Sequence, residues 1–197
     1  MAVGVAQLNG SPFVTITHKD ENNDSGFIDS NALWDTLVEA DGKSSIMTAG
    51  SECPSGSYGD EGCYTTDGIP GGHAFTTIGV TTVDVDGTDV RLVKVRNPWG
   101  QEEYRGKWSD SSDLWTDALR EQVSNALGDA DDDNEGIFYM DIDSYVANLS
   151  ETQINADTSS WFFDSFLMLG DTKSETVNAD SCSGCTQHII EVTNNSD

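Results

Sequence analysis

The chain has 197 residues, of which 9 are Lys or Arg and 35 are Asp or Glu, giving a formal net charge of −26 at pH 7. Charge of this size repels nucleic-acid phosphates and anionic lipid headgroups, so it argues against both as partners and leaves cations and basic partners open. No stretch approaches the roughly 20 apolar residues that span a bilayer, so we predict no transmembrane segment. The first residues lack a basic leader and a long apolar core, so we expect a cytoplasmic protein.

The first elements are a polar segment, a short helix and a long loop. Residues 1–28 are polar and turn-rich. Asp29 or Ser30 can cap a helix that Gly42 can end, because apolar residues recur there at helical spacing: Leu33, Trp34, Leu37 and Val38. Residues 50–72 are rich in glycine and indicate a long loop. Loops of this length are usually functional or disordered, and we expect this one to border a functional site.

Two β-rich runs follow the glycine-rich loop. Residues 75–85 and 90–95 are rich in β-branched side chains and flank Asp86-Gly87, a strong hairpin signal. Side chains alternate along a strand, so Val93, Val95 and Asn97 share one face. Asn97 is therefore predicted at the end of the second strand.

The second half of the chain is predicted to hold two helices and one buried strand. Ser111 or Ser112 can cap a helix that ends at Gly128, with apolar positions Leu114, Trp115, Leu119, Val123 and Leu127. An acidic loop, a strand over 137–140 and a helix capped by Asp141 and running to Leu149 come next. Beyond Ser150 the periodicity fades, except for a strand-like run at 188–192.

The four cysteines could be disulfide-bonded, reduced or bound to a metal. In an oxidising compartment they could form two disulfides, but without a signal peptide we favour reduced thiols with no shared role. Cys182 and Cys185 form a C-x-x-C pair that could be redox-active or half of a zinc site. Zinc needs four ligands and only His188 lies near the pair in sequence, so we disfavour metal binding there.

One histidine and one asparagine stand out as candidate catalytic residues. His18 and His188 lie in contexts that favour surface or structural roles, whereas His73 stands between the glycine-rich loop and the first strand of the hairpin. Pro98 holds Asn97 in an extended conformation, so its amide oxygen can accept a hydrogen bond from the imidazole. Such a pair is the orienting half of a cysteine-protease triad. The alternative is an Asx turn over Pro98 with Trp99 in the core.

Four blocks, in order, make the chain resemble the calpain family of cysteine proteases: Gly72-His73-Ala74-Phe75, Val93-Lys94-Val95-Arg96-Asn97-Pro98-Trp99-Gly100, Gly106-Lys107-Trp108-Ser109-Asp110 and Glu135-Gly136-Ile137-Phe138-Tyr139-Met140. The resemblance implies an α+β fold, with an antiparallel sheet and flanking helices, that forms the base-bearing lobe of a papain-like cysteine protease. It implies three segments. These are a polar N-terminal segment (1–28), a calpain-like catalytic subdomain (29–149) and a divergent C-terminal segment (150–197) that could begin a following β domain.

The resemblance also implies a calcium-dependent cysteine endopeptidase that acts on protein substrates. His73 would be the catalytic base, Asn97 would orient it, and Trp99 would shield their hydrogen bond from water. The family carries its nucleophile on a separate subdomain N-terminal to the histidine block, and we identify no matching cysteine. Cys53 and Cys63 lack the helix N-terminus that lowers a thiol pKa.

We therefore expect the isolated chain to be inactive and to need a cysteine-bearing subdomain, in cis or in trans. The alternative is a non-catalytic lobe, derived from a protease, that binds calcium or a protein partner. A helix-borne cysteine in a longer reading frame or in a partner chain would decide between the two.

Calcium ligands are implied at four positions that match the family: Glu103, Asp110, Asp133 through its main-chain carbonyl, and Glu135. Hard oxygen ligands of this kind suit calcium. Ile137 stands where the family has a further acid, for which Asp131 or Asp132 could substitute. A solvated acidic loop is the alternative. An EF-hand is disfavoured because Ile142 occupies the twelfth position of the loop, where the bidentate acid belongs.

Overall fold

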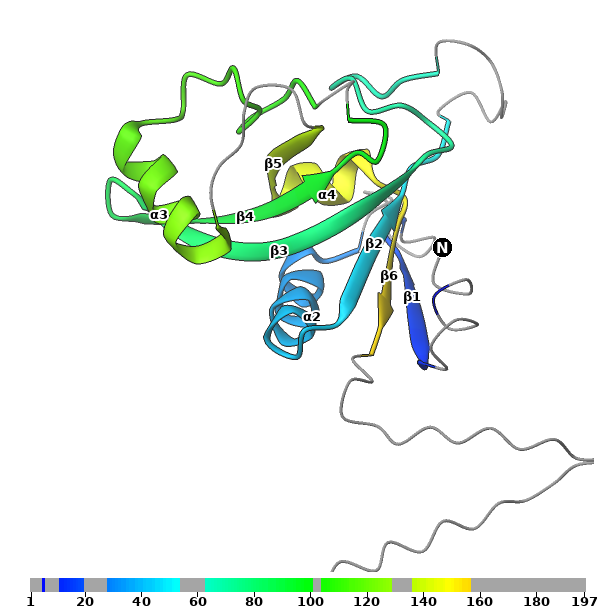
Figure 1. The fold of residues 1–197 in the computed structure, drawn as a ribbon. Coiled ribbons are helices and arrows are strands. Elements are labelled where there is room, and N and C mark those ends of the chain that lie inside the picture. Colours follow the sequence, from blue (N-terminus) through cyan, green and yellow to red (C-terminus); the bar gives the residue numbers. More distant parts are fainter. Residues whose placement is uncertain are drawn as a thin grey trace, which may run out of the picture. The chain divides into compact units, whose positions relative to one another are not determined.

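The computed structural model describes residues 5, 11–19, 28–53, 63–100, 104–128 and 136–156. These belong to one compact unit, residues 1–161, and the second unit, 162–197, lies outside them. The described part contains a sheet in the order β1-β6-β2-β3-β4-β5 and three helices (Figure 1). The elements are β1 Phe13–Thr17, α2 Ser30–Gly42, β2 Ile46–Gly50, β3 Ala74–Val85, β4 Thr88–Arg96, α3 Asp117–Leu127, β5 Ile137–Asp141, α4 Ile142–Asn148 and β6 Glu151–Asn155.

Every neighbouring pair in this six-stranded sheet is antiparallel, which confirms the predicted α+β class. The β3–β4 hairpin is confirmed too. Asp86 and Gly87 have φ angles of 53° and 82° at its tip, a left-handed conformation that Gly and Asp tolerate. The start of β3 and the end of β4 therefore lie at the same end of the hairpin, which brings His73 and Asn97 together.

Two helices begin where the sequence predicts them, and one does not. Asp29 caps α2 by accepting from the Asn31 N–H, and Asp141 caps α4 by accepting from the Ser144 N–H. The predicted start of α3 at Ser111 or Ser112 is wrong, because Thr116 caps that helix. Residues 111–116 form turns instead, in which the Trp115 indole N–H donates to the Ser109 carbonyl at 3.0 Å.

The sheet extends into both segments that flank 29–149. β1 pairs with β6, for example Thr15 with Gln153, and β6 pairs with β2. Neither strand was predicted. Each has only five residues, and each finds its partners far away in the sequence, so no local turn signal marks their pairing.

Two hydrophobic clusters cover opposite faces of the sheet. Phe138 and Met140 of β5 belong to the larger cluster, with α2 and α4, whereas Tyr139 between them belongs to the smaller cluster, with α3. Because side chains alternate along a strand, the two clusters must lie on different faces. Of the four apolar positions that define α2 in the sequence, Leu33, Trp34 and Leu37 are buried, whereas Val38 is 46% exposed.

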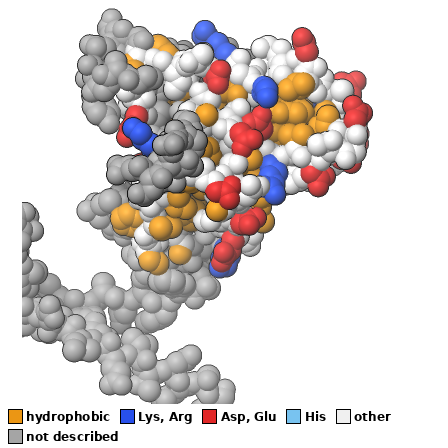
Figure 2. Space-filling model, turned by 180° about the vertical axis from the view of Figure 1, so that it is seen from behind, with side chains coloured by type: hydrophobic (Ala, Val, Ile, Leu, Met, Phe, Trp, Pro, Cys, Tyr) orange, Lys and Arg blue, Asp and Glu red, His pale blue; other side chains and the backbone are white. Residues whose placement is uncertain are grey.

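On one face of the described residues, acidic side chains are spread over the surface (Figure 2). Figure 2 shows acidic side chains scattered between apolar patches on the face seen from behind, with few Lys and Arg among them. Among the helices that the structure describes, none is long and apolar enough to cross a membrane.

Candidate active site

His73 and Asn97 form a hydrogen bond at the end of the β3–β4 hairpin. The imidazole Nε2 of His73 lies 2.8 Å from the amide Oδ1 of Asn97. An amide oxygen only accepts, so Nε2 carries the hydrogen and donates it. In the neutral ring, Nδ1 then holds a lone pair, and no described residue bonds to it. The arrangement leaves a basic nitrogen available to a further group.

Two aromatic rings contact the imidazole of His73. The ring of Trp99 lies 3.9 Å from it between centroids, tilted by 34°, and the buried Phe75 meets it edge-on at 4.8 Å. Trp99 is 57% exposed, so it is not a core residue. It covers one side of the imidazole while remaining open to solvent, and its role as a shield over the His73–Asn97 hydrogen bond stays a prediction.

The Asx turn over Pro98, the alternative role of Asn97, also forms. The Trp99 N–H donates to Asn97 Oδ1 at 3.0 Å, so the same oxygen accepts from the turn and from the imidazole. The side chain of Asn97 is thus fixed by its own turn before it meets His73. Turn formation and imidazole binding are compatible, and they are not the rival outcomes that the sequence suggested.

A glycine that sequence reasoning missed holds the backbone of Asn97. The Asn97 N–H donates to the Gly136 carbonyl at 2.7 Å, and Asn97 is fully buried. Gly136 has a φ of +72°, and a Cβ there would lie 2.7 Å from the Asn97 carbonyl oxygen and 2.9 Å from the Gly100 Cα. Only glycine fits this approach. The available signal was a glycine directly before a buried strand.

Sequence similarity to a known protein family extends over most of the chain. A family model described as calpain family cysteine protease matches residues 4–156. The chain belongs to the calpain family of cysteine proteases. The match is wider than the predicted catalytic subdomain, 29–149, and it includes β1 and β6, which lie outside that range.

Curated calpains match the chain at moderate identity. Calpain-9 of Rattus norvegicus is 37% identical over 87 residues, 44% of this chain and 12% of that protein. The calpain-type cysteine protease DEK1 of Arabidopsis thaliana is 38% identical over 112 residues, which are 56% of this chain and 5% of that protein. Calpain-12 of Homo sapiens is 34% identical over 125 residues, which are 64% of this chain and 16% of that protein. The chain thus spans a small part of these calpains.

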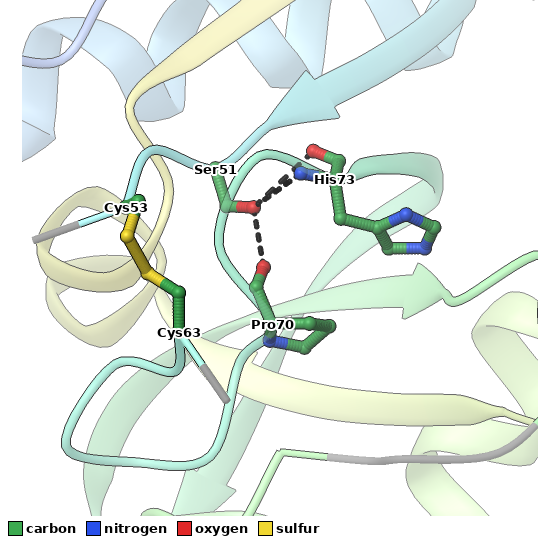
Figure 3. The surroundings of a disulfide bond; sticks show 5 residues. All are labelled: Ser51, Cys53, Cys63, Pro70 and His73. Carbon is green, nitrogen blue, oxygen red and sulfur yellow. Dashed lines mark hydrogen bonds between the residues drawn. A yellow bond between two sulfur atoms is a disulfide. The ribbon is translucent and has the colours of Figure 1, made fainter. Parts of the chain in front are cut away.

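The structure corrects the expectation of reduced thiols at two of the cysteines. Cys53 and Cys63 form a disulfide with their Cα atoms 5.7 Å apart, because Cys63 lies beside the residues that follow β2 (Figure 3). Neither sulfur carries a thiol in this state, which agrees with setting both aside as nucleophiles. Disulfides are rare in the reducing cytosol, so the bond does not support the expected cytoplasmic location, which stays a prediction. Cys182, Cys185 and His188 lie outside the described residues.

Only one of the four predicted calcium ligands can be located. Asp110 lies in a turn between β4 and α3, and its main-chain carbonyl accepts from the Arg120 guanidinium at 3.0 Å. Glu103, Asp133 and Glu135 lie outside the described residues, as do Asp131 and Asp132. Within the described ranges, no three acidic, histidine or cysteine side chains cluster as metal ligands.

Proposed function

We propose that this chain is the base-bearing half of a calpain-type cysteine endopeptidase and that His73 is its catalytic base. The observation that carries the proposal is the 2.8 Å hydrogen bond from His73 Nε2 to Asn97 Oδ1, because it directs the lone pair of Nδ1 away from Asn97. The Trp99 ring at 3.9 Å supports it, since it limits the access of water to that bond.

The chemistry follows from this tautomer. A cysteine thiol placed against Nδ1 gives its proton to His73, and the thiolate attacks the carbonyl carbon of a peptide bond. The imidazolium then returns the proton to the leaving amine. A water molecule, deprotonated by Nδ1, hydrolyses the thioester and releases the acid and the thiol. Asn97 keeps Nε2 protonated and the ring oriented throughout.

The proposal requires a cysteine-bearing subdomain in cis or in trans, and protein substrates. We therefore expect the purified chain, with its disulfide intact, to leave casein uncleaved, because a base without a thiol has no covalent route to an acyl-enzyme. A reconstituted enzyme, meaning this chain fused to or mixed with a cysteine-bearing calpain subdomain, should cleave casein. Release of acid-soluble peptide measures both.

Two results would contradict this scheme. Casein hydrolysis by the purified chain alone, lost on thiol alkylation and in Cys53→Ala, would show that a nucleophile lies within it. A folded, stably associated reconstituted enzyme without activity would instead favour the second candidate, a non-catalytic lobe that binds calcium or a protein partner.

We further propose that calcium binds beside the site, between the segment after Gly100 and the segment before β5. Supporting this, a Cβ on Gly136 would lie 2.9 Å from the Gly100 Cα, so these two backbones touch. Glu103 closely follows Gly100 in the sequence, and Glu135 directly precedes Gly136. Carboxylate and carbonyl oxygens suit calcium.

Calcium affinity should be weak, with a dissociation constant of about 10⁻⁴–10⁻³ M, because Ile137 replaces one acid and water must complete the shell. Titration calorimetry of the chelator-treated chain should detect the site and lose it in Asp110→Ala. Asp113→Ala is the matched control, since it removes an exposed carboxylate from the same turn region. Equal calcium binding in the wild type and in both variants would instead assign the ions to the acidic surface.

A further inference from the structure

Ser51 continues the pairing of β2 with β3 by one residue beyond the end of the ladder. Its N–H donates to the His73 carbonyl at 2.9 Å, and its own carbonyl accepts from the Gly72 N–H at 2.9 Å. In a regular ladder the His73 N–H would donate to the Ser51 carbonyl. Here that carbonyl accepts from the Gly72 N–H instead. The N–H of His73 therefore needs another acceptor.

The hydroxyl of Ser51 is that acceptor. The His73 N–H donates to Ser51 Oγ at 3.1 Å, and the hydroxyl donates to the Pro70 carbonyl at 2.6 Å (Figure 3). Ser51 is only 6% exposed, so water cannot readily replace it. One hydroxyl thus joins both ends of the Gly71-Gly72 turn that leads into His73.

The Cys53–Cys63 disulfide packs against the Gly71-Gly72 turn. Cys53 lies two residues after Ser51, and the Gly71 N–H donates to the Cys63 carbonyl at 2.8 Å. A Cβ on Gly71 would lie 2.8 Å from both Cys53 Cα and Cys63 Sγ, so the turn packs directly against the disulfide. Figure 3 shows the His73 side chain extending away from this cluster, while its backbone faces Ser51.

We propose that Ser51 is a positioning residue for His73. The inference rests on the proposed role of His73 as base and adds the device that sets its position. Asn97 is held through the Gly136 carbonyl, and His73 is held through the Ser51 hydroxyl, so each partner of the Nε2–Oδ1 hydrogen bond has its own backbone anchor. Without the hydroxyl, the His73 N–H and the Pro70 carbonyl would lose a partner in a buried place, and the turn would relax.

The first test uses the purified chain and needs no activity. Two-bond ¹H–¹⁵N correlation spectra of the imidazoles, recorded where the rings are neutral, distinguish a protonated from a bare ring nitrogen. The wild type should show His73 with Nε2 protonated, and Asn97→Ala should show averaged signals for the two nitrogens. We expect Ser51→Ala to resemble Asn97→Ala, and Ser51→Thr, which keeps the hydroxyl, to resemble the wild type.

Ser150→Ala is the matched control, because the Ser150 hydroxyl donates to the Gly50 carbonyl at 3.1 Å, next to Ser51. It should keep the wild-type imidazole signals. An unaltered His73 tautomer in a folded Ser51→Ala chain would overturn the proposal. Should Ser51→Ala not fold, hydrogen exchange of the wild type still decides the matter. The His73 amide should exchange at least about 10-fold more slowly than an unprotected amide if Ser51 holds it, and an unprotected rate would overturn the anchor.

Activity provides the second, separate readout. In the reconstituted enzyme, Ser51→Ala should lower kcat about 10-fold with little change in KM, because the hydroxyl acts on the base and touches no substrate. If the wild-type reconstituted enzyme is inactive while the imidazole spectra change as expected, the proposed function fails and the anchor stands. If the enzyme is active and Ser51→Ala matches the wild type in kcat and in tautomer, the anchor fails and the function stands.

Discussion

A folded His73→Ala variant of the reconstituted enzyme should lose at least about 10³-fold in kcat/KM, because general acid–base catalysis contributes roughly 10²–10⁴-fold and the thiol also loses its proton acceptor. Asn97→Ala should retain measurable activity. Asparagine moves no proton, and its loss only frees the ring to take the other tautomer. Hydrolysis of a fluorogenic peptide measures both rates.

The Asn97 result needs a control for folding, because Asn97 Oδ1 also accepts the Trp99 N–H in the Asx turn. Asn97→Asp is the matched variant, since a carboxylate can accept both hydrogen bonds and so preserve the turn. We expect it to keep more activity than Asn97→Ala. Circular dichroism checks that each variant is folded. Equal rates for wild type and a folded His73→Ala enzyme would remove the catalytic role and leave the family assignment.

Local chemistry explains which elements could be predicted. The hairpin follows from Asp86-Gly87 between β-branched runs, and the starts of α2 and α4 follow from the caps Asp29 and Asp141. The start of α3 failed because tertiary contacts override helical spacing there. Trp115 packs against Trp108 and Tyr139, with ring centroids 5.1 and 5.5 Å apart, and these contacts hold it in a turn.

The same contrast between local signals and tertiary contacts applies to the site. The pairing of His73 with Asn97 could be predicted from strand alternation and family motifs, because side chains of distinctive type carry it. The anchors Ser51 and Gly136 could not, since they act through backbone hydrogen bonds whose partners depend on register. The Cys53–Cys63 bond depends on where Cys63 lies relative to the end of β2, which the spacing of the two cysteines does not determine.

His18 is a buried structural residue, as its sequence context favoured, and it joins the two strands that the sequence did not predict. It is fully buried, with Nδ1 at 2.7 Å from the Leu149 carbonyl and Nε2 at 2.8 Å from Thr152 Oγ1. The carbonyl can only accept, so Nδ1 carries the hydrogen, and in the neutral ring Nε2 accepts from the Thr152 hydroxyl. The oxygen of Thr152 then accepts from the Tyr145 hydroxyl, 2.9 Å away. A neutral imidazole therefore completes this chain of hydrogen bonds.

Burial lowers the pKa of His18 from 6.5 to about 4, although the Leu149 carbonyl partly opposes the shift. The unfolded chain therefore binds one more proton than the folded chain between these two values. The stability that depends on neutral His18 is fully present above pH 6.5 and is lost as the pH falls toward 4. A shift of this size corresponds to about 3 kcal/mol, at 1.36 kcal/mol per pH unit.

We expect the free energy of unfolding of the wild type to fall more steeply between pH 6.5 and 4 than that of His18→Gln, with a difference of up to about 1.4 kcal/mol per pH unit. Urea unfolding followed by tryptophan fluorescence at several pH values measures both slopes. The comparison removes the contribution of the 35 acidic residues, because both proteins carry them. His18→Gln should be less stable than the wild type at pH 7.5, since glutamine fits this hydrogen-bonded place imperfectly, and the two curves should converge toward pH 4. Parallel curves would show that His18 is protonated equally in the folded and unfolded chains, and the buried neutral imidazole would then have to be abandoned.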